Sequence, residues 1–303
     1  MRTRKLMTTA LAVLGLGACL LEAKPKEAAL VKTHADVAYD EHERTVLDFW
    51  QGEGEGPRPL LVVIHGGGWL GGDKSRFKHP EHYTKHGISV AAISYRLAKT
   101  DPLPTPVLDA ARAVQFLRSK AEEWNIDKSR VLLTGDSAGG CSSLWIACHP
   151  ELAEPFSKDP VERESTRVLG AAVAGAQVSI EPEVLEAWVG PFGLHGMITG
   201  AVGEPDAAAL KKNAAKHAKT FQRFSPIQHL SADDPAIWMG YDSDLSLPAK
   251  SPGHGIHHGI FGIKFQEKSQ QVGHGKVFVA AGEKYQTPYH GMRDFIIKTL
   301  TEK

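Results

Sequence analysis

The chain has 303 residues and a formal net charge of zero, because 35 lysines and arginines balance 35 aspartates and glutamates. Without a basic block or stripe, this composition argues against nucleic-acid binding. A hydrophobic content of 42%, with no internal repeat or low-complexity tract, fits one globular domain with a sizeable core.

Residues 1–23 are predicted to form a signal peptide and not part of the fold. A basic segment, residues 2–5, precedes an apolar run from Leu6 to Leu21 that glycines interrupt and that is short for a membrane span. The sequence Leu16-Gly17-Ala18-Cys19 resembles a bacterial lipoprotein processing site, at which Cys19 would carry a lipid anchor. Ordinary cleavage nearby is the alternative. Either way, the chain is expected to be exported, as a periplasmic protein, a membrane-anchored lipoprotein or a secreted protein.

Residues 36–303 alternate predicted strands and helices, which indicates a mostly parallel sheet with helices on both faces. An antiparallel hairpin is expected between Val37 and Trp50, turning at residues 40–43. Further strands are predicted at Leu60–Ile64, Ile88–Ser94, Val131–Thr134, Val168–Ala174, Ala236–Tyr241 and Val277–Ala280. Helices are predicted at Val107–Trp124, Ala138–Cys148, His257–Gln271 and Met292–Leu300.

A glycine-rich loop follows the first buried strand. Leu60–Ile64 is a continuous apolar run, typical of a parallel strand buried on both faces, and it leads into His65-Gly66-Gly67-Gly68-Trp69. Three consecutive glycines leave backbone N–H groups unshielded, and such donors can stabilise the negative oxygen of a tetrahedral intermediate. The alternative is a flexible glycine turn. His65 is expected to brace the loop, whereas Trp69 is open between core packing and a pocket wall.

Gly135-Asp136-Ser137-Ala138-Gly139 stands between a predicted strand and a predicted helix. Gly-x-Ser-x-Gly in this strand–turn–helix context is the pattern of a nucleophile elbow. The serine must occupy a sharp turn with strained backbone angles, and the glycines let strand and helix approach closely. The helix N-terminus adds free N–H groups and the positive end of the helix dipole, where an oxyanion can develop. Ser137 is therefore the predicted nucleophile.

These two motifs, with Gly71-Gly72-Asp73-Lys74-Ser75 and Ser94-Tyr95-Arg96-Leu97, resemble the α/β-hydrolase esterases. The closest groups are the hormone-sensitive-lipase-like enzymes and the bacterial acetylxylan and feruloyl esterase-like proteins. The resemblance is specific over about residues 40–150 and looser beyond them. It implies the α/β-hydrolase fold, Ser137 as nucleophile, and an oxyanion hole formed by the N–H groups of Gly67, Gly68 and Ala138.

Two later segments bear on the organisation of the domain. Cys141 and Cys148 lie on one predicted helix, about 10 Å apart along its axis, which is too far for a disulfide. They are expected to be small buried apolar residues, so no disulfide is predicted in the mature domain. Residues 181–230 depart from the strand–helix rhythm. They are predicted to form a small cap-like insertion over the active-site edge, and a surface excursion is the alternative.

The triad acid is expected just after the strand Ala236–Tyr241, at the carboxyl edge of the sheet where α/β proteins bind ligands. Asp242 and Asp244 both satisfy this condition. The related enzymes have an aspartate four residues before a proline, which Asp244 and Pro248 match, although the distance from Gly240 is one residue longer than the family pattern. Asp244 is therefore favoured and Asp242 is the alternative, while at least one of the two is expected only to cap a turn.

His290 is the predicted base, because it is the only histidine after the last predicted strand and completes the order Ser…Asp…His of the α/β hydrolases. A second set of histidines, His254, His257 and His258, has no recognised metal-ligand spacing. These three are expected to begin a helix or to line the pocket rim, and no metal site is predicted.

The sequence thus predicts a serine hydrolase of the carboxylesterase type, with the triad Ser137, Asp244 and His290 and without a cofactor. The expected substrate is a small-molecule or polysaccharide-linked ester, with a short acyl, acetyl or feruloyl group. Two alternatives stay open. One is an amide-cleaving relative, a peptidase or an arylformamidase, and the other is a non-catalytic surface protein with the same fold.

Overall fold

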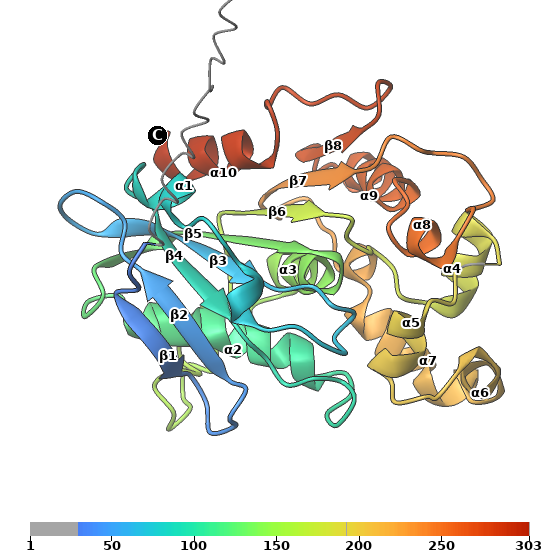
Figure 1. Ribbon diagram of the computed structural model, residues 1–303, viewed down its shortest axis with the longest axis horizontal. Coiled ribbons are helices and arrows are strands. Elements are labelled where there is room, and N and C mark those ends of the chain that lie inside the picture. The colour runs from blue at the N-terminus through green and yellow to red at the C-terminus, as the bar shows by residue number, and fades with distance from the viewer. Residues whose placement is uncertain (1–29, 192, 303) are drawn as a thin grey trace, which may run out of the picture.

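The structure, a computed structural model, describes residues 30–191 and 193–302. Eight strands form one sheet in the order β1-β2-β4-β3-β5-β6-β7-β8, in which β1 and β2 pair antiparallel with their neighbours and all other pairs are parallel (Figure 1). The strands are β1 (His34–Ala38), β2 (Val46–Trp50), β3 (Arg58–Ile64), β4 (Ser89–Ile93), β5 (Ile126–Asp136), β6 (Gly170–Ala174), β7 (Ala236–Tyr241) and β8 (Val277–Ala281). The predicted hairpin and mostly parallel sheet are confirmed.

Helices cover both faces of this sheet. The helices are α1 (Glu81–Thr84), α2 (Thr105–Ser119), α3 (Ser137–Cys148), α4 (Pro182–Val189), α5 (Gly196–Ala201), α6 (Ala207–Lys212), α7 (Ala214–Phe224), α8 (Pro252–Ile256), α9 (Ile260–Gln271) and α10 (Met292–Thr301). Short 3₁₀ turns occur at Lys74–Arg76 and Pro226–Gln228. α2, α3 and α9 contribute to one hydrophobic core, whereas α1 and α10 pack on the opposite face (Figure 1).

The alternation of side chains along β3 explains this two-sided core. Leu60, Val62 and Ile64 point into the core beneath α2 and α3, while Leu61 points into the core beneath α10. Successive side chains of a strand face opposite sides of the sheet, so a continuous apolar run is the expected sequence of a strand covered on both faces. All four of these side chains are fully buried.

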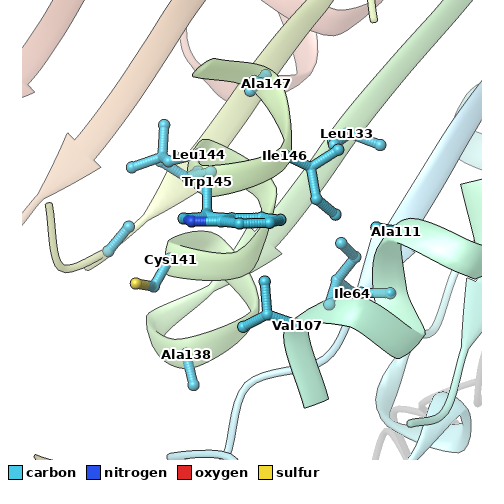
Figure 2. Packing of buried hydrophobic residues seen from close by; sticks show 14 of the residues in the cluster. Ile64, Val107, Ala111, Leu133, Ala138, Cys141, Leu144, Trp145, Ile146 and Ala147 are labelled. Atoms are coloured by element: carbon cyan, nitrogen blue, oxygen red, sulfur yellow. The ribbon is translucent and has the colours of Figure 1, made fainter. Parts of the chain in front are cut away.

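Trp145 is one of the two largest fully buried side chains of the first core, with Trp69. Trp145 lies on α3 and belongs to the same buried cluster as Ile64, Leu133 and Val107 (Figure 2), and its ring stacks on Phe224 at the end of α7 with 5.0 Å between centroids. Its exposed fraction is 0%, and its indole N–H donates to the carbonyl of Arg223 at 2.7 Å. Because truncating a buried tryptophan costs about 3–5 kcal/mol, this packing holds α3, and with it the start of α3, firmly on the sheet.

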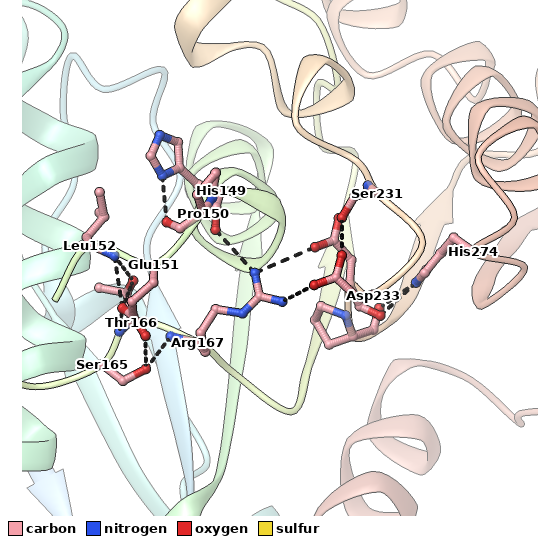
Figure 3. A network of polar contacts seen from close by, with 12 residues as sticks. His149, Pro150, Glu151, Leu152, Ser165, Thr166, Arg167, Ser231, Asp233 and His274 are labelled. Atoms are coloured by element: carbon pink, nitrogen blue, oxygen red, sulfur yellow. Dashed lines mark hydrogen bonds and ion pairs between the residues drawn. The ribbon is translucent and has the colours of Figure 1, made fainter.

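Parallel strands bring their following loops to one edge. The glycine-rich loop after β3, the turn from β5 to α3 and the loop after β7 therefore lie at the carboxyl edge of the sheet. At the opposite edge, Arg167 joins the segments that precede β6 and β7. Its guanidinium approaches Asp233 Oδ2 at 3.5 Å and donates to the carbonyl of His149 at 3.5 Å (Figure 3).

Residues 181–230 hold α4, α5, α6 and α7, which lie together beside the carboxyl edge and away from the main helical layers (Figure 1). The insertion contacts the glycine-rich loop, because a Cβ added at Gly68 would lie 3.4 Å from the Cβ of Met197 on α5. This segment therefore borders the site, and its role as a cap stays a prediction.

Two predicted helices differ from the structure. The helix predicted at Val107–Trp124 ends at Ser119, with Lys120 in a non-helical conformation. The helix predicted at His257–Gln271 begins only at Ile260, and a separate short helix, α8, precedes it. Ser251 accepts a hydrogen bond from the N–H of His254 and Pro252 follows at the first helical position, which starts α8 independently. His257 therefore lies in a break between two helices.

Three further expectations concern single residues or the membrane. Cys141 and Cys148 are free and buried, as predicted. Residues 1–23 and Cys19 lie outside the described residues. Within the part that is described, no helix has the length and apolarity that a membrane span requires.

Candidate active site

Ser137 begins α3 immediately after β5, at the carboxyl edge of the sheet. Its φ angle is 51°, in the left-handed region that non-glycine residues rarely adopt. Strain of this kind persists only where the surrounding structure imposes it. Gly139 allows the close approach of α3 to β3, since a Cβ added there would lie 2.6 Å from the carbonyl oxygen of His65. The predicted elbow geometry is thus present around Ser137.

The residue that meets Ser137 is His257. The Nε2 atom of His257 lies 2.9 Å from Oγ of Ser137, across 120 residues of sequence. The other ring nitrogen, Nδ1, lies 3.0 Å from the carbonyl oxygen of Gly253 in α8. Because a carbonyl only accepts, Nδ1 must carry the hydrogen, and the lone pair of Nε2 is left facing the serine hydroxyl.

The structure does not bring His290 to Ser137: in the described part of the chain, the imidazole that meets Ser137 is that of His257. The chain turns back directly after β8, where the N–H of Ala281 donates to the carbonyl of Tyr285 at 3.1 Å. At the start of α10, the backbone N–H of His290 donates to Asp294 at 3.0 Å. The side chain of His290 consequently lines a different pocket, beside Tyr83 and Arg293.

The structure also does not place the carboxylate of Asp244 against the ring of His257, although the backbone carbonyl of Asp244 lies 2.9 Å from Nε2 of His254. Oδ2 of Asp244 accepts from the ammonium of Lys250 at 2.7 Å, and its Oδ1 accepts from the N–H and the hydroxyl of Ser246 at 3.0 and 2.7 Å. These hydrogen bonds, that from Lys250 first, hold the pKa of the carboxyl well below its usual range. In the described part of the chain, neither Asp244 nor Asp242 hydrogen-bonds to His257, although both line the pocket around it.

The glycine-rich loop stands directly beside the elbow. The N–H of Gly66 donates to Oδ1 of Asp136 at 3.3 Å. Gly67 and Gly68 have φ angles of 108° and 66°. Among the described residues, the N–H groups of these two glycines have no hydrogen-bond partner within the protein. They are therefore available to a ligand, and the oxyanion hole at Gly67 and Gly68 stays a prediction. The N–H of Ala138 belongs to the first turn of α3.

His65 braces this loop from the buried side. Its Nδ1 lies 2.7 Å from the carbonyl oxygen of Gly66, and its ring stacks on Tyr95 with 4.1 Å between centroids. The hydroxyl of Tyr95 in turn donates to the carbonyl of His65 at 2.7 Å. Burial disfavours the charged imidazolium and lowers the pKa of His65 to about 4, so the ring is neutral near pH 7.

Trp69, the last residue of the motif, belongs to the core. Its exposed fraction is 0%, and its indole N–H donates to Oγ of Ser142 on α3 at 3.0 Å. Of the two alternatives that the sequence left open, the structure supports core packing. The contact also ties the glycine-rich loop to the helix that begins at Ser137.

Ser137 and His257 open into a pocket of about 750 Å³ at the carboxyl edge. Its lining includes three carboxylates and two aromatic side chains: Asp136, Asp242, Asp244, Trp238 and Tyr241. The insertion reaches this region as well. His195 caps α5, and its pKa is lowered, first by partial burial and second by the nearby His257.

Metal-ligating side chains do not converge on Ser137 in the described residues. The rings of His254 and His258 lie 4.9 Å apart, but no third ligand joins them in the part of the chain that the structure describes. Within the described ranges, one group of three, His79, Glu81 and His82, brings its ligand atoms within 4.8 Å of one another. None of these three residues lines the pocket around Ser137.

Comparison with known proteins shows which family the sequence matches and which curated proteins it resembles. The BD-FAE family model matches residues 47–250. The protein named "Probable carboxylic ester hydrolase LipM" from Mycobacterium tuberculosis is 28% identical over 218 residues, which cover 70% of this chain and 48% of LipM. The chain thus spans about half the length of this relative.

Solved structures are similar in fold. A truncated form of a carbohydrate esterase from gut microbiota is 19% identical with a TM-score of 0.72, over 92% of this chain and 99% of that chain. An acetyl ester-xyloside bifunctional hydrolase from Caldicellulosiruptor lactoaceticus is 21% identical with a TM-score of 0.60, over 78% of this chain and 76% of that chain. With the sheet order, these similarities confirm the predicted α/β-hydrolase fold.

Proposed function

Because this chain belongs to the BD-FAE family, we propose that it hydrolyses carboxylic esters through an acyl-enzyme on Ser137, with His257 as the base. The observation that carries the proposal is the 2.9 Å contact between Ser137 Oγ and His257 Nε2. A nucleophile and a base within hydrogen-bond reach, with the base oriented by a third group, are what nucleophilic catalysis requires. Here the third group is the carbonyl of Gly253.

Acylation follows from the protonation state of His257. Its Nε2 lone pair accepts the proton of Ser137 as the oxygen attacks the ester carbonyl. The negative oxygen of the tetrahedral intermediate is stabilised by the N–H groups of Gly67, Gly68 and Ala138, and by the positive end of α3. His257 then gives the proton to the departing alcohol.

Deacylation repeats these steps with water. His257 takes a proton from the water molecule that attacks the acyl-enzyme, and Ser137 leaves with that proton restored. The imidazolium that forms in each half-reaction lies in a pocket with Asp136, Asp242 and Asp244, whose negative charges stabilise it at a distance. This cycle requires no cofactor.

The charge of the pocket favours a neutral alcohol group. Asp136 and Asp242 disfavour an anionic substrate and can accept hydrogen bonds from hydroxyl groups, while the charge of Asp244 is paired with Lys250. Trp238 and Tyr241 add apolar surface to the same lining. A short acyl ester of a carbohydrate or of another hydroxylated alcohol matches these features, and the carbohydrate esterases among the similar structures support the same class.

The proposal is tested with the purified chain and p-nitrophenyl acetate, acetylated xylan, a formamide and a peptide. We expect hydrolysis of the esters, labelling of the protein by a fluorophosphonate, and loss of both in Ser137→Ala. Loss of the nucleophile of a triad costs on the order of 10⁶ in kcat. Faster cleavage of the formamide or peptide would instead favour the amide-cleaving alternative. A chain that neither turns over nor labels is a non-catalytic protein of this fold.

We also propose that the chain is exported, on the basis of the sequence of residues 1–23. Cell fractionation should find it outside the cytoplasm, and Cys19→Ser should release it from membranes if Cys19 carries a lipid. A variant that stays membrane-bound would contradict lipidation, and an unprocessed cytoplasmic chain would contradict export altogether.

A further inference from the structure

Gln177 is a fully buried amide just beyond β6, with an exposed fraction of 0%. Its Nε2 donates to the carbonyl oxygen of Ile256 at 2.6 Å and to that of Gly175 at 3.1 Å. Ile256 ends α8 and directly precedes His257. One side chain therefore fastens the end of β6 to the residue before the base.

The orientation of this amide follows from its partners. Both are carbonyl oxygens, which can only accept, so the NH₂ group of Gln177 must face them. Its Oε1 is buried and has no hydrogen-bond partner among the described residues. Because a buried unpaired oxygen costs stability, the contribution of this side chain comes from the two bonds that its NH₂ group donates.

Gly175 provides the space for the imidazole. Its φ angle is 53°, and a Cβ added there would lie 3.2 Å from Cδ2 of His257, a tight contact that would require the ring to shift by a few tenths of an ångström. The backbone around it is fixed to β7. The N–H of Gly175 donates to the carbonyl of Gly240 at 2.8 Å, and the hydroxyl of Tyr241 donates to the carbonyl of Ala176 at 2.8 Å.

His257 is thus bounded at three points of its ring: by Ser137 at Nε2, by Gly253 at Nδ1 and by Gly175 at Cδ2. No carboxylate hydrogen-bonds to this ring in the described part of the chain. We propose that Gln177 and Gly175 are positioning residues that hold His257 in the attacking geometry, the task a carboxylate performs in a Ser-His-Asp triad. This inference rests on the proposed function of Ser137 and His257.

The first test replaces Gln177 by methionine, which has a similar length but donates no hydrogen bond. Misplacing a reacting group by about 1 Å costs about 10²-fold in rate. We therefore expect Gln177→Met to lower kcat on p-nitrophenyl acetate by roughly 10²-fold, with KM changed by less than about threefold. The imidazole Nδ1–H signal of His257, followed by NMR in the free protein, should shift or broaden.

Gln115 offers a matched control. It is also buried, and its Nε2 also donates to two backbone carbonyls, those of Glu162 at 3.2 Å and Glu164 at 2.8 Å, but it lies on α2 and does not line the pocket. Gln115→Met removes the same pair of hydrogen bonds elsewhere. We expect it to lower the melting temperature as Gln177→Met does, while kcat stays within about twofold and the His257 signal is unchanged.

The second test, Gly175→Ala, displaces the ring and leaves Gln177 in place, so it remains informative if Gln177→Met fails to fold. Gly203→Ala is its control, since Gly203 also has a positive φ, 75°, and the added Cβ would meet only Pro102, at 3.4 Å. We expect Gly175→Ala to lower kcat by roughly 10²-fold, and Gly203→Ala not to do so.

The outcomes separate the two proposals. A parent protein that neither hydrolyses esters nor labels at Ser137 defeats the proposed function, whatever the variants do. If the parent is active, a kcat within twofold of the parent in folded Gln177→Met or in Gly175→Ala overturns the positioning role. Equal losses of kcat in the Gln177 and Gln115 variants would overturn it too.

Discussion

The carboxylate of Asp244 is paired with the ammonium of Lys250 at 2.7 Å and not with an imidazole. Both side chains are largely exposed, and the same carboxylate also caps the turn at Ser246. Asp244 thus performs the structural role that the sequence assigned to at least one aspartate of this loop.

This arrangement leads to a prediction about both aspartates. Asp244→Asn and Asp242→Asn should each keep kcat within about tenfold of the parent, because an exposed carboxylate that does not contact the base contributes little to its orientation. Steady-state kinetics on p-nitrophenyl acetate decide the matter. A loss near 10⁴ in one variant, the size expected when a triad aspartate is neutralised, would return that aspartate to the triad.

The two candidate histidines can be separated in the same assay. His257→Ala should lower kcat by roughly 10⁴ to 10⁶, as expected when the base of a serine triad is removed. His290→Ala should stay within about threefold, because this residue lines a separate pocket beside Tyr83 and Arg293. The reverse pattern would restore His290, and His257 would then be a pocket residue without a catalytic role.

These contrasts show what the sequence could and could not predict. The strands could be predicted because each is an apolar run, and Ser137 could be predicted because its motif fixes the backbone locally. The contact of His257 with Ser137 could not be predicted, because the two residues are 120 positions apart in the sequence and helical periodicity obscured the break before Ile260. Ser251 followed by Pro252 was the available signal, because this pair starts a separate short helix.

The residues that position His257 could not be predicted from the sequence either. Gln177 and Gly175 acquire their roles only when β6 and α8 are packed together, and no local pattern encodes that contact. Similarly, the pairing of Asp244 with Lys250 depends on where the lysine side chain points. Spacing within a loop does not determine such orientations, because an exposed loop can bulge by one residue at little cost.

The neutral, buried ring of His65 predicts a pH dependence of stability. The pKa of this imidazole is about 4 in the folded protein, because of burial, and near 6.5 when the chain is unfolded. Between these values the unfolded chain binds a proton that the folded protein does not, so the free energy of unfolding falls as pH falls from 6.5 to 4. This loss of unfolding free energy reaches about 3 kcal/mol below pH 4 and is absent above pH 6.5.

Urea denaturation at several pH values between 7 and 4 measures this effect. His65→Asn can still donate to the carbonyl of Gly66 but does not titrate in this range. Its stability should therefore decline less steeply than that of the parent, by up to about 1.4 kcal/mol per pH unit. Parallel stability curves for the two proteins would show that another group is responsible for the acid sensitivity.

The last prediction concerns the close approach of α3 to β3 at Gly139. A Cβ at this position would overlap the backbone carbonyls of Ile64 and His65, which cannot move without disturbing β3 and the glycine-rich loop. Overpacking usually costs about 1–3 kcal/mol, and a clash with fixed backbone lies at or above the upper end of that range. Gly139→Ala should accordingly lose at least about 3 kcal/mol of unfolding free energy and most esterase activity, since it shifts Ser137 relative to Gly67 and Gly68.

Gly196→Ala is the matched control: nothing lies within 4 Å of the added Cβ, and the residue begins α5. The control should be neutral or stabilised by up to about 1 kcal/mol, and equal losses in the two variants, measured by urea denaturation, would refute the role of close packing at the elbow.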